Sequence, residues 1–168
     1  MQRNRLNLVI DPWRIVEADF DPARVEAAES LFALGNGVMG GRANFEERYS
    51  GPSLQGNYIG GGYYPDKTRV GWWKNGYPEY FAKVLNAAFW IGVDIEVDGE
   101  PLDLATVAVT DFYREMDMRR SVLTRRMTVT MRNGVEVSVE AVRFLSLTRR
   151  ELGVIRYAVT PLNRAAEI

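Results

Sequence analysis

The stretch SVLTRRMTVTMRNGVEVSVEA, residues 121–141, decides the fold of this chain. Apolar and polar side chains alternate with a period of two on both sides of a central Arg132-Asn133-Gly134, a pattern typical of half-buried β-strands. The apolar positions are Leu123, Met127, Val129 and Met131 before the turn and Val135, Val137, Val139 and Ala141 after it. Residues 121–141 therefore predict an antiparallel β-hairpin.

The loop length of this hairpin follows from the requirement that both strands bury the same face. A two-residue loop would place apolar residues opposite polar ones along the whole ladder, because a one-residue slip moves every side chain to the other face. A three-residue loop, with Gly134 in the left-handed region of the backbone, pairs Met131 with Val135 and keeps the faces matched. We predict this loop, with the further pairs Val129–Val137, Met127–Val139 and Arg126–Glu140.

Strand patterns also occupy much of the rest of the chain. After Ala141 the next large apolar residues are Val142 and Phe144, which fall on the opposite face from Val137, Val139 and Ala141. This change in the alternation predicts a bulge or bend near Ala141. The only helix signal is a short turn over residues 22–28, with Asp21 as its cap. About six to nine strands with almost no helix predict an all-β fold, an antiparallel β-sandwich. The other predicted strands include residues 91–97, 107–114 and 152–159.

The composition excludes several kinds of site. The sequence has no histidine and no cysteine, which rules out a Ser-His-Asp triad, a histidine metal site, a thiol nucleophile and a disulfide. Its 21 basic and 22 acidic residues nearly balance, which excludes a generally basic nucleic-acid binder. No apolar run approaches the roughly 18 residues of a membrane span, and no signal-peptide core follows Arg3 and Arg5. We therefore expect a soluble, cytoplasmic protein without membrane contact.

Two segments rich in glycine and aromatic residues do not behave like strands, and we expect them to be long ordered connections. The segment GNGVMGG, residues 35–41, is either a tight turn packed against backbone or an anion site, but it lacks the P-loop and dinucleotide fingerprints. Within residues 58–90, the aromatic side chains of Trp72, Trp73 and Tyr77 are the candidates for stacking on a sugar. The alternative is that they anchor a long connection or pack against another domain.

The charged residues show no arrangement in the sequence that is typical of a catalytic site. Five arginines lie between residues 119 and 132 with no acidic residue among them. On a strand Arg125 and Arg126 point to opposite faces, so we expect a solvated or salt-bridged surface, with anion binding as the alternative. The carboxylates of Glu46, Glu47 and Asp117 show no spacing typical of a catalytic pair. The residues alone predict a β fold and no metal site, and assign no activity.

A series of short motifs runs in one order through most of the chain. The motifs are ESLFALGNG (29–37), GGRANFEE (40–47), NYIGGGY (57–63), KVLN (83–86) with Trp90, REMDMR (114–119), VLTR (122–125), RFLS (143–146) and TPLN (160–163). Together these motifs resemble the N-terminal domain of glycoside hydrolase family 65. Residues 66–86, with WWKNGY at 72–77, are most similar to the maltose phosphorylases of that family. Two departures stand at Gly41 and Ala43, where the family usually has a branched apolar residue and a glycine.

The resemblance implies an inverting phosphorolysis of an α-glucosidic disaccharide such as maltose, giving β-glucose 1-phosphate and glucose. Inorganic phosphate is the co-substrate, and neither a metal nor an organic cofactor takes part. The family's general acid and phosphate site lie in an (α/α)₆ barrel that follows the β domain. No catalytic residue is therefore expected in this chain, and the chain alone is expected to be inactive.

The resemblance also sets expectations about domains and partners. We expect residues 1–168 to be an incomplete β super-sandwich of the galactose-mutarotase-like kind, whose missing partner is the catalytic barrel. Strand edges left open by the missing part predict association between copies of the chain. A second function stays open at this point, that of a stand-alone carbohydrate-binding β-sandwich module built on Trp72, Trp73 and Tyr77.

Overall fold

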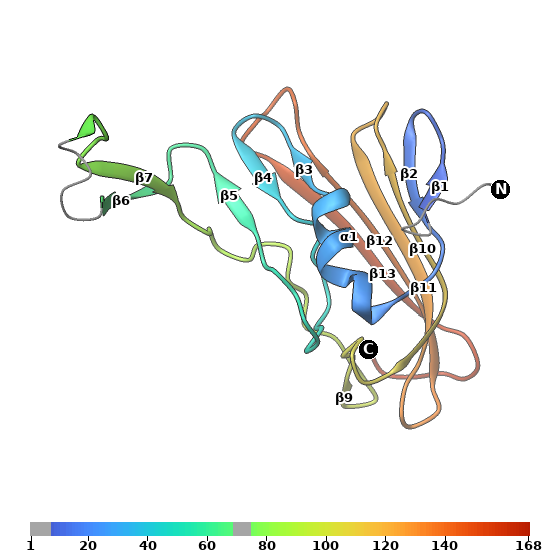
Figure 1. Ribbon diagram of the computed structural model, residues 1–168. Helices are drawn as coiled ribbons and strands as arrows, with labels where there is room; N and C mark the ends of the chain where they lie inside the picture. The colour runs from blue at the N-terminus through green and yellow to red at the C-terminus, as the bar shows by residue number, and fades with distance from the viewer. Residues whose placement is uncertain (1–7, 69–74) are drawn as a thin grey trace.

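The computed structural model describes residues 8–68 and 75–168, and its centre is an antiparallel sheet of six strands in the order β1-β2-β10-β11-β12-β13 (Figure 1). One short α-helix, α1, lies on this sheet, and the prediction of an all-β fold with little helix is confirmed. The six strands are β1 Leu8–Ile10, β2 Arg14–Glu17, β10 Ala108–Asp117, β11 Val122–Thr130, β12 Glu136–Leu145 and β13 Gly153–Pro161.

The hairpin β11–β12 has the predicted three-residue loop. Gly134 adopts a φ of 81°, in the left-handed region that favours glycine. The backbone N–H of Met131 donates to the carbonyl of Val135 at 2.8 Å, and the N–H of Gly134 donates back to Met131 at 3.0 Å. The predicted register is confirmed by the pairs Val129–Val137, Met127–Val139 and Arg126–Glu140.

The predicted bulge near Ala141 is wrong. The register between β11 and β12 runs unbroken past Ala141, and Leu123 stands opposite Arg143. The alternation keeps its phase because Arg143, only 4% exposed, occupies an inward position that an apolar residue would ordinarily hold. The register shift in this sheet lies instead in β10, between Thr110 and Tyr113.

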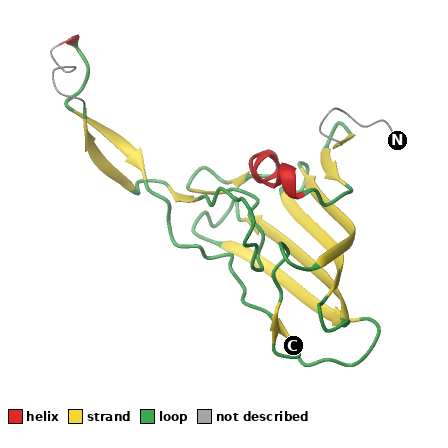
Figure 2. Ribbon diagram, turned by 60° about the horizontal axis from the view of Figure 1, so that its bottom comes forward, coloured by secondary structure: helices red, strands yellow, loops and turns green. Residues whose placement is uncertain are grey.

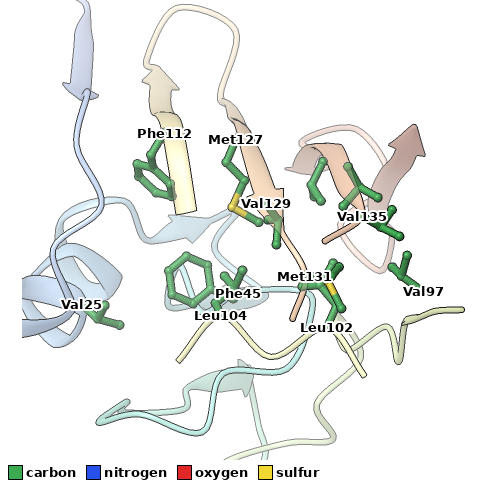
Figure 3. Close-up of a cluster of buried hydrophobic side chains, with 12 residues drawn as sticks. Val25, Phe45, Val97, Leu102, Leu104, Phe112, Met127, Val129, Met131 and Val135 are labelled. Atoms are coloured by element: carbon green, nitrogen blue, oxygen red, sulfur yellow. The ribbon is translucent and has the colours of Figure 1, made fainter. Parts of the chain in front are cut away.

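The main core lies between the inner face of the sheet and a layer made mostly of loops. Phe112, Met127 and Val129 project from the strands toward Phe45 and Leu104 on the covering segments (Figure 3). The covering layer supplies buried side chains from three separate parts of the sequence, at Val25, at Phe45 and at residues 97–104, so the core depends on long-range contacts. The buried apolar residues are Val25, Phe45, Val97, Leu102, Leu104, Phe112, Met127, Val129, Met131, Val135, Val137 and Val139.

The other predicted elements had mixed outcomes. The strands expected at 107–114 and 152–159 are confirmed as β10 and β13, whereas most of 91–97 is loop and only β8, Glu96–Val97, pairs with β9, Glu100–Pro101. The predicted cap is confirmed, since the carboxylate of Asp21 accepts from the N–H of Ala23 at 3.0 Å. A 3₁₀ turn over Pro22–Arg24 leads into α1, Val25–Leu31, which ends three residues beyond the expected Ala28.

Residues 35–41 and 58–90 contain strands that the sequence patterns did not indicate. Strands β3, Leu34–Gly35, β4, Met39–Gly41, and β5, Asn57–Ile59, form a three-stranded sheet. Strands β6, Tyr63–Lys67, and β7, Tyr80–Val84, pair with each other alone and project from the body as an arm (Figures 1 and 2). We call the paired strands β6 and β7 the arm.

Candidate functional site

Three arginines point inward from neighbouring strands of the large sheet. Arg114 on β10, Arg125 on β11 and Arg143 on β12 are each at most 4% exposed. Arg114 and Arg125 stand directly opposite each other in the register. Three like charges at such short spacing, away from water, require compensating carboxylates and hydrogen-bond acceptors.

The compensating carboxylates come from strand β2 and from a loop that crosses the inner face. Glu17 on β2 accepts from Nη2 of Arg114 at 2.6 Å and from its Nε at 3.0 Å. Glu47 on the loop takes a bidentate contact from Arg125, with Nη1 to Oε1 at 2.6 Å and Nη2 to Oε2 at 2.5 Å. Bidentate pairing is the geometry in which arginine holds a carboxylate most firmly. We call these residues, together with Glu46 and Arg143, the buried ion network.

Glu46 links two of the arginines in this network. Its Oε2 accepts from Nη2 of Arg125 at 2.7 Å, and its Oε1 lies 3.3 Å from Nη1 of Arg143. Tyr157 on β13 completes the set, because its hydroxyl donates to Oε2 of Glu47 at 3.0 Å. The network therefore ties loop residues 46 and 47 to three adjacent strands of the sheet.

Aromatic rings and backbone carbonyls surround the same arginines. The guanidinium carbon of Arg114 lies 4.8 Å from the centre of the Phe32 ring, and that of Arg125 lies 5.1 Å from the centre of the Phe45 ring. Such cation–π contacts stabilise a cation that has left water. Nη1 of Arg114 also donates to the carbonyl of Ala43 at 3.4 Å. The arginines are thus compensated on several sides.

In the buried ion network, the pKa shifts favour the ionised form of the Glu46 carboxyl and the protonated form of the Tyr157 hydroxyl. Burial by itself would raise the pKa of Glu46, but the charges of Arg125 and Arg143 outweigh it and hold that pKa below its ordinary value. Burial and then the charge of Glu47 raise the pKa of the Tyr157 hydroxyl. A general acid needs a carboxyl pKa raised toward the working pH, so Glu46 is unsuited to that task.

Other candidate carboxylates also hold structure together. Oδ1 of Asp117 accepts from the backbone N–H groups of Arg119 and Arg120 at 3.0 and 3.1 Å and so closes the turn after β10. The fully buried Glu29 accepts from the hydroxyl of Ser53 and from the N–H of Leu54 at 2.8 Å. Within residues 8–68 and 75–168, no group of His, Cys, Asp and Glu side chains could hold a metal ion.

The arginines between residues 119 and 132 are divided between two environments. Arg125 and Arg126 lie on opposite faces, as predicted, but the expectation that all of them lie on the surface is wrong for Arg125, which sits in the buried ion network. Arg126 lies over the ring of Tyr113 on the outer face, at 4.7 Å from its centre. Arg119 lies over the Trp13 ring at 4.4 Å.

The glycine-rich segment 35–41 is a tight hairpin organised by Asn36, which confirms the turn interpretation. Oδ1 of Asn36 accepts from the N–H groups of Val38 and Met39 at 3.0 and 2.7 Å. Its Nδ2 donates to the carbonyls of Ser146 and Arg150 at 2.8 and 2.9 Å. The N–H groups that would cradle an anion are therefore used within the hairpin, which argues against an anion site.

Of the aromatic candidates for sugar stacking, Tyr77 lies in the segment that joins β6 to β7. Tyr77 is 55% exposed, whereas Trp72 and Trp73 fall outside the described residues. The arm itself carries more exposed rings, including Tyr63 and Tyr80. Its apolar side chains are available for contact with another surface, whether a protein or a ligand.

Two of the open depressions on the surface lie near these features, one beside the loop that carries Glu46 and Glu47 and one at the base of the arm. A cleft of about 380 Å³ is lined by residues 44–49 and 92–94 together with Ser53, Gln55 and Phe89. The carboxylates of Glu46 and Glu47 in this lining are paired with Arg125. A groove of about 410 Å³ lies at the base of the arm, lined by residues 37–40, 58–63, Ala82 and Val84. Over the described ranges, no helix is long and apolar enough to cross a membrane.

The sequence patterns did not identify the buried ion network, although they contained a signal for it. Arg125 has the same parity as Leu123 and Met127, and Arg143 has the same parity as Ala141 and Leu145. An arginine at an inward position of a strand indicates a buried ion pair. The partner carboxylates could not be assigned in this way, because Glu47 lies 78 residues from Arg125.

These observations define a β-sheet domain whose buried charges serve its own packing. Comparison with known proteins agrees: the family model for the N-terminal domain of glycosyl hydrolase family 65 matches residues 15–168. The chain belongs to this family.

Named relatives include phosphorylases with different substrates. The chain is 46% identical over 159 residues to the maltose phosphorylase of Bacillus subtilis, which covers 95% of this chain and 21% of that protein. It is 33% identical to the α,α-trehalose phosphorylase of Thermoanaerobacter brockii, covering 94% of this chain and 21% of that one. A solved structure described as a putative kojibiose phosphorylase from the human microbiome superposes with a TM-score of 0.81 at 29% identity, covering 92% of this chain and 20% of the other. The chain thus spans about a fifth of the length of these relatives.

Proposed function

We propose that this chain is the N-terminal, non-catalytic domain of an inverting glycoside phosphorylase that acts in the cytoplasm on an α-glucosidic disaccharide such as maltose. The observation that carries the proposal is the 46% identity to a maltose phosphorylase along 95% of the chain. The identities to trehalose and kojibiose phosphorylases are lower, at 33% and 29%. Maltose is therefore the first substrate to test.

The chemistry of the proposed reaction explains why this domain would lack turnover of its own. Phosphate attacks the anomeric carbon while a carboxylic acid protonates the departing sugar oxygen, so the enzyme needs one general acid and cationic groups for the anion. In this chain the best-placed cations, Arg114, Arg125 and Arg143, are already neutralised by Glu17, Glu46 and Glu47. The reaction would then depend on residues of a catalytic barrel, with no metal or organic cofactor.

The proposed contribution of the domain is mechanical support. The buried ion network holds loop residues 46 and 47 against three strands, which makes a rigid frame for neighbouring parts of a longer polypeptide. The exposed apolar side chains of the arm would contact the barrel or another subunit at the rim of the active site. Support of this kind affects turnover indirectly, through the placement of the catalytic domain.

An activity assay tests this function directly. The 168-residue chain and the full-length protein that carries it are each incubated with phosphate and maltose, trehalose or kojibiose, and β-glucose 1-phosphate is measured. We expect activity from the full-length protein, highest with maltose and unaffected by dialysis against a chelator, and none from the chain alone. Turnover by the 168-residue chain would overturn the proposal.

A stand-alone carbohydrate-binding module is the second candidate, and the exposed side chain of Tyr77, in the segment between β6 and β7, favours it. Aromatic rings stack on sugar faces, and such a module would bind without catalysis. Titration of the chain with maltose, followed by tryptophan fluorescence, separates the two functions. Saturable binding that Tyr77→Ala weakens supports a module, and the absence of any response supports the structural domain.

A further inference from the structure

Strand β10 contains a bulge that strains one residue on the outer face of the large sheet. The register of β10 with β11 shifts between Thr110 and Tyr113. Asp111 and Phe112 together therefore stand opposite Met127. Phe112 is buried in the core, whereas Asp111 is exposed and adopts a φ of 51°, in the left-handed region that is unfavourable for a residue with a side chain. Bulges and strained residues of this kind are concentrated at functional sites.

The position of Asp111 separates it from other residues with a positive φ. Among the described residues other than glycine, Asp98 and Ser121 also have a positive φ, and both stand in turns between strands. The carboxylate of Asp98 accepts from the N–H of Glu167 at 2.8 Å. The carboxylate of Asp111 has no hydrogen-bond or ion-pair partner within residues 8–68 and 75–168. Packing of the domain therefore does not explain why an aspartate stands at this strained position.

A depression of about 380 Å³ opens on the outer face at the bulge. Beside the carboxylate of Asp111 it carries the guanidinium of Arg126, which lies over the Tyr113 ring at 4.7 Å and has no carboxylate partner in the described part of the chain. One unpaired charge of each sign gives no preference for a polyanion. The lining consists of Asp111, Phe112, Tyr113, Arg126, Met127, Thr128 and Ser138.

A row of hydroxyl groups crosses the sheet through this depression. Directly opposite residues of neighbouring strands share a face, and the row consists of Thr110, Thr128, Ser138 and Thr160 on β10, β11, β12 and β13. None of the four hydroxyls has a hydrogen-bond partner among the described residues. Strands lie about 4.8 Å apart, so the row is about 14 Å long. Threonine suits an exposed strand face in any protein, but the unpaired charges beside the row indicate a ligand.

We propose that this outer face binds a chain of neutral sugars through Asp111, Arg126 and the hydroxyl row. Neighbouring hydroxyls of a sugar can donate to the carboxylate and accept from the guanidinium, and both contacts are of the stronger, charge-assisted kind. Each protein hydroxyl can donate and accept in the same way as a sugar hydroxyl. An apolar ligand would instead bury the two charges without compensation.

The shape of the surface adds a preference for chain length. One sugar ring fills only the depression, whereas a longer chain also reaches the hydroxyls toward β13. The site lies on the large sheet and is separate from Tyr77, which belongs to the segment between β6 and β7 (Figure 1). Binding there requires no catalysis and is independent of the function proposed for the parent enzyme.

Calorimetric titration of the 168-residue chain tests the proposal with glucose, maltotetraose and cellotetraose. We expect saturable binding of at least one tetrasaccharide, with a lower dissociation constant than for glucose. In nitrogen-15 NMR spectra the amide signals of residues 110–113, 126–128 and 138 should shift. The described lining contains no tryptophan, so calorimetry and NMR report on this site where tryptophan fluorescence does not. Absence of saturable binding at millimolar concentrations of both tetrasaccharides would overturn the proposal.

Asp111→Gly separates binding from stability. Glycine accepts a positive φ without strain, so this variant should unfold at the same temperature as the parent or higher. It lacks the carboxylate, and we expect the dissociation constant of the tetrasaccharide to rise at least about tenfold. Unchanged affinity of the Asp111→Gly protein would contradict the assigned site.

A matched pair of substitutions tests the hydroxyl row. Thr128→Val removes a hydroxyl of the row and should weaken binding at least about threefold, whereas Thr124→Val changes the same strand and face outside the lining and should leave affinity unchanged. Equal effects of the two would refute the row. Binding that Tyr77→Ala abolishes and Thr128→Val leaves intact would place the sugar between β6 and β7 and would refute it too. Turnover of the full-length protein should be the same with and without Thr128→Val, so the two proposals fail separately.

Discussion

The guanidinium of Arg125 and the carboxylate of Glu47 form a bidentate pair, with nitrogen–oxygen contacts of 2.6 and 2.5 Å and both side chains buried. This pair joins a strand of the large sheet to the loop that covers it. Burial of two charges is unfavourable in itself, and full compensation in the folded state is what makes it tolerable. The stability of the domain should therefore depend on complete pairing in this network.

Replacement of one partner is the most direct test of that dependence. Arg125→Met removes the bidentate partner of the buried Glu47 and leaves Glu46 with Arg143 alone, and we expect the free energy of unfolding to fall by about 3–5 kcal/mol. The matched control is Arg126→Met, one residue along and on the outer face, which should change it by less than about 0.5 kcal/mol. Urea unfolding at pH 7 measures both. Equal losses for the two variants would show that burial of the pair is not what matters.

The lowered pKa of Glu46 predicts a dependence of stability on acid pH. Because the folded pKa lies below the ordinary value of 4.5, the unfolded chain binds more protons as pH falls past that value. The contribution of Glu46 is complete above about pH 5 and is lost as pH falls through the folded pKa. Glu46→Gln should lower the free energy of unfolding by about 2 kcal/mol at pH 7.

That loss should shrink as the two proteins are compared at pH 5, 4 and 3, values chosen to span the fall below the ordinary pKa. The exposed Glu96→Gln serves as the control and should parallel the parent protein at each pH. A constant difference between Glu46→Gln and the parent over this range would mean that Glu46 does not titrate as its contacts with Arg125 and Arg143 require.

The raised pKa of Tyr157 predicts the opposite trend at alkaline pH. The folded protein keeps the phenolic proton, which donates to Glu47, while the unfolded chain releases it near the ordinary value of 10.0. The contribution of Tyr157 is complete below about pH 10 and is lost as pH rises toward the folded pKa. Tyr157→Phe should cost about 1–2 kcal/mol at pH 7 and less at pH 11. Urea unfolding at both values checks this, and a gap that widens with pH would contradict it.

The four hydrogen bonds of Asn36 predict a large effect from a small substitution. Asn36→Ala leaves the carbonyls of Ser146 and Arg150 without their donor, and we expect the free energy of unfolding to fall by about 1–3 kcal/mol. Asn36→Asp keeps the acceptor for the N–H groups of Val38 and Met39 but lacks the donor. Thermal unfolding should therefore rank the parent above both variants, and an Asn36→Ala protein as stable as the parent would refute this account of the hairpin.

Local patterns were sufficient for the strands of the β11–β12 hairpin. Alternation with a period of two is a property of neighbouring residues, and matching the faces of Met131 and Val135 selected one register and a left-handed Gly134. The same reasoning failed at Ala141, because it assumed that an inward position must be apolar. Arg143 is inward and charged, and its contacts with Glu46 and with the carbonyl of Asn44 make that possible.

The arm shows a different limit of pattern reasoning. Residues 63–67 and 80–84 are short, and each contains little alternation, so the sequence indicated a connection where two strands pair. Short strands form when a partner supplies hydrogen bonds, which no single segment reveals. The fact that the arm projects from the body emerged only from the structure (Figure 2).

The sequence by itself determined the all-β class, the hairpin register and the family, because these follow from alternation, turn residues and motifs that lie close together along the chain. Only the tertiary structure decided that Arg114, Arg125 and Arg143 are buried and that Asn36 holds a loop 110 residues away. The physical reason is compensation at a distance. A buried charge or amide is stable only where its partners converge in space, and those partners lie on distant parts of the chain.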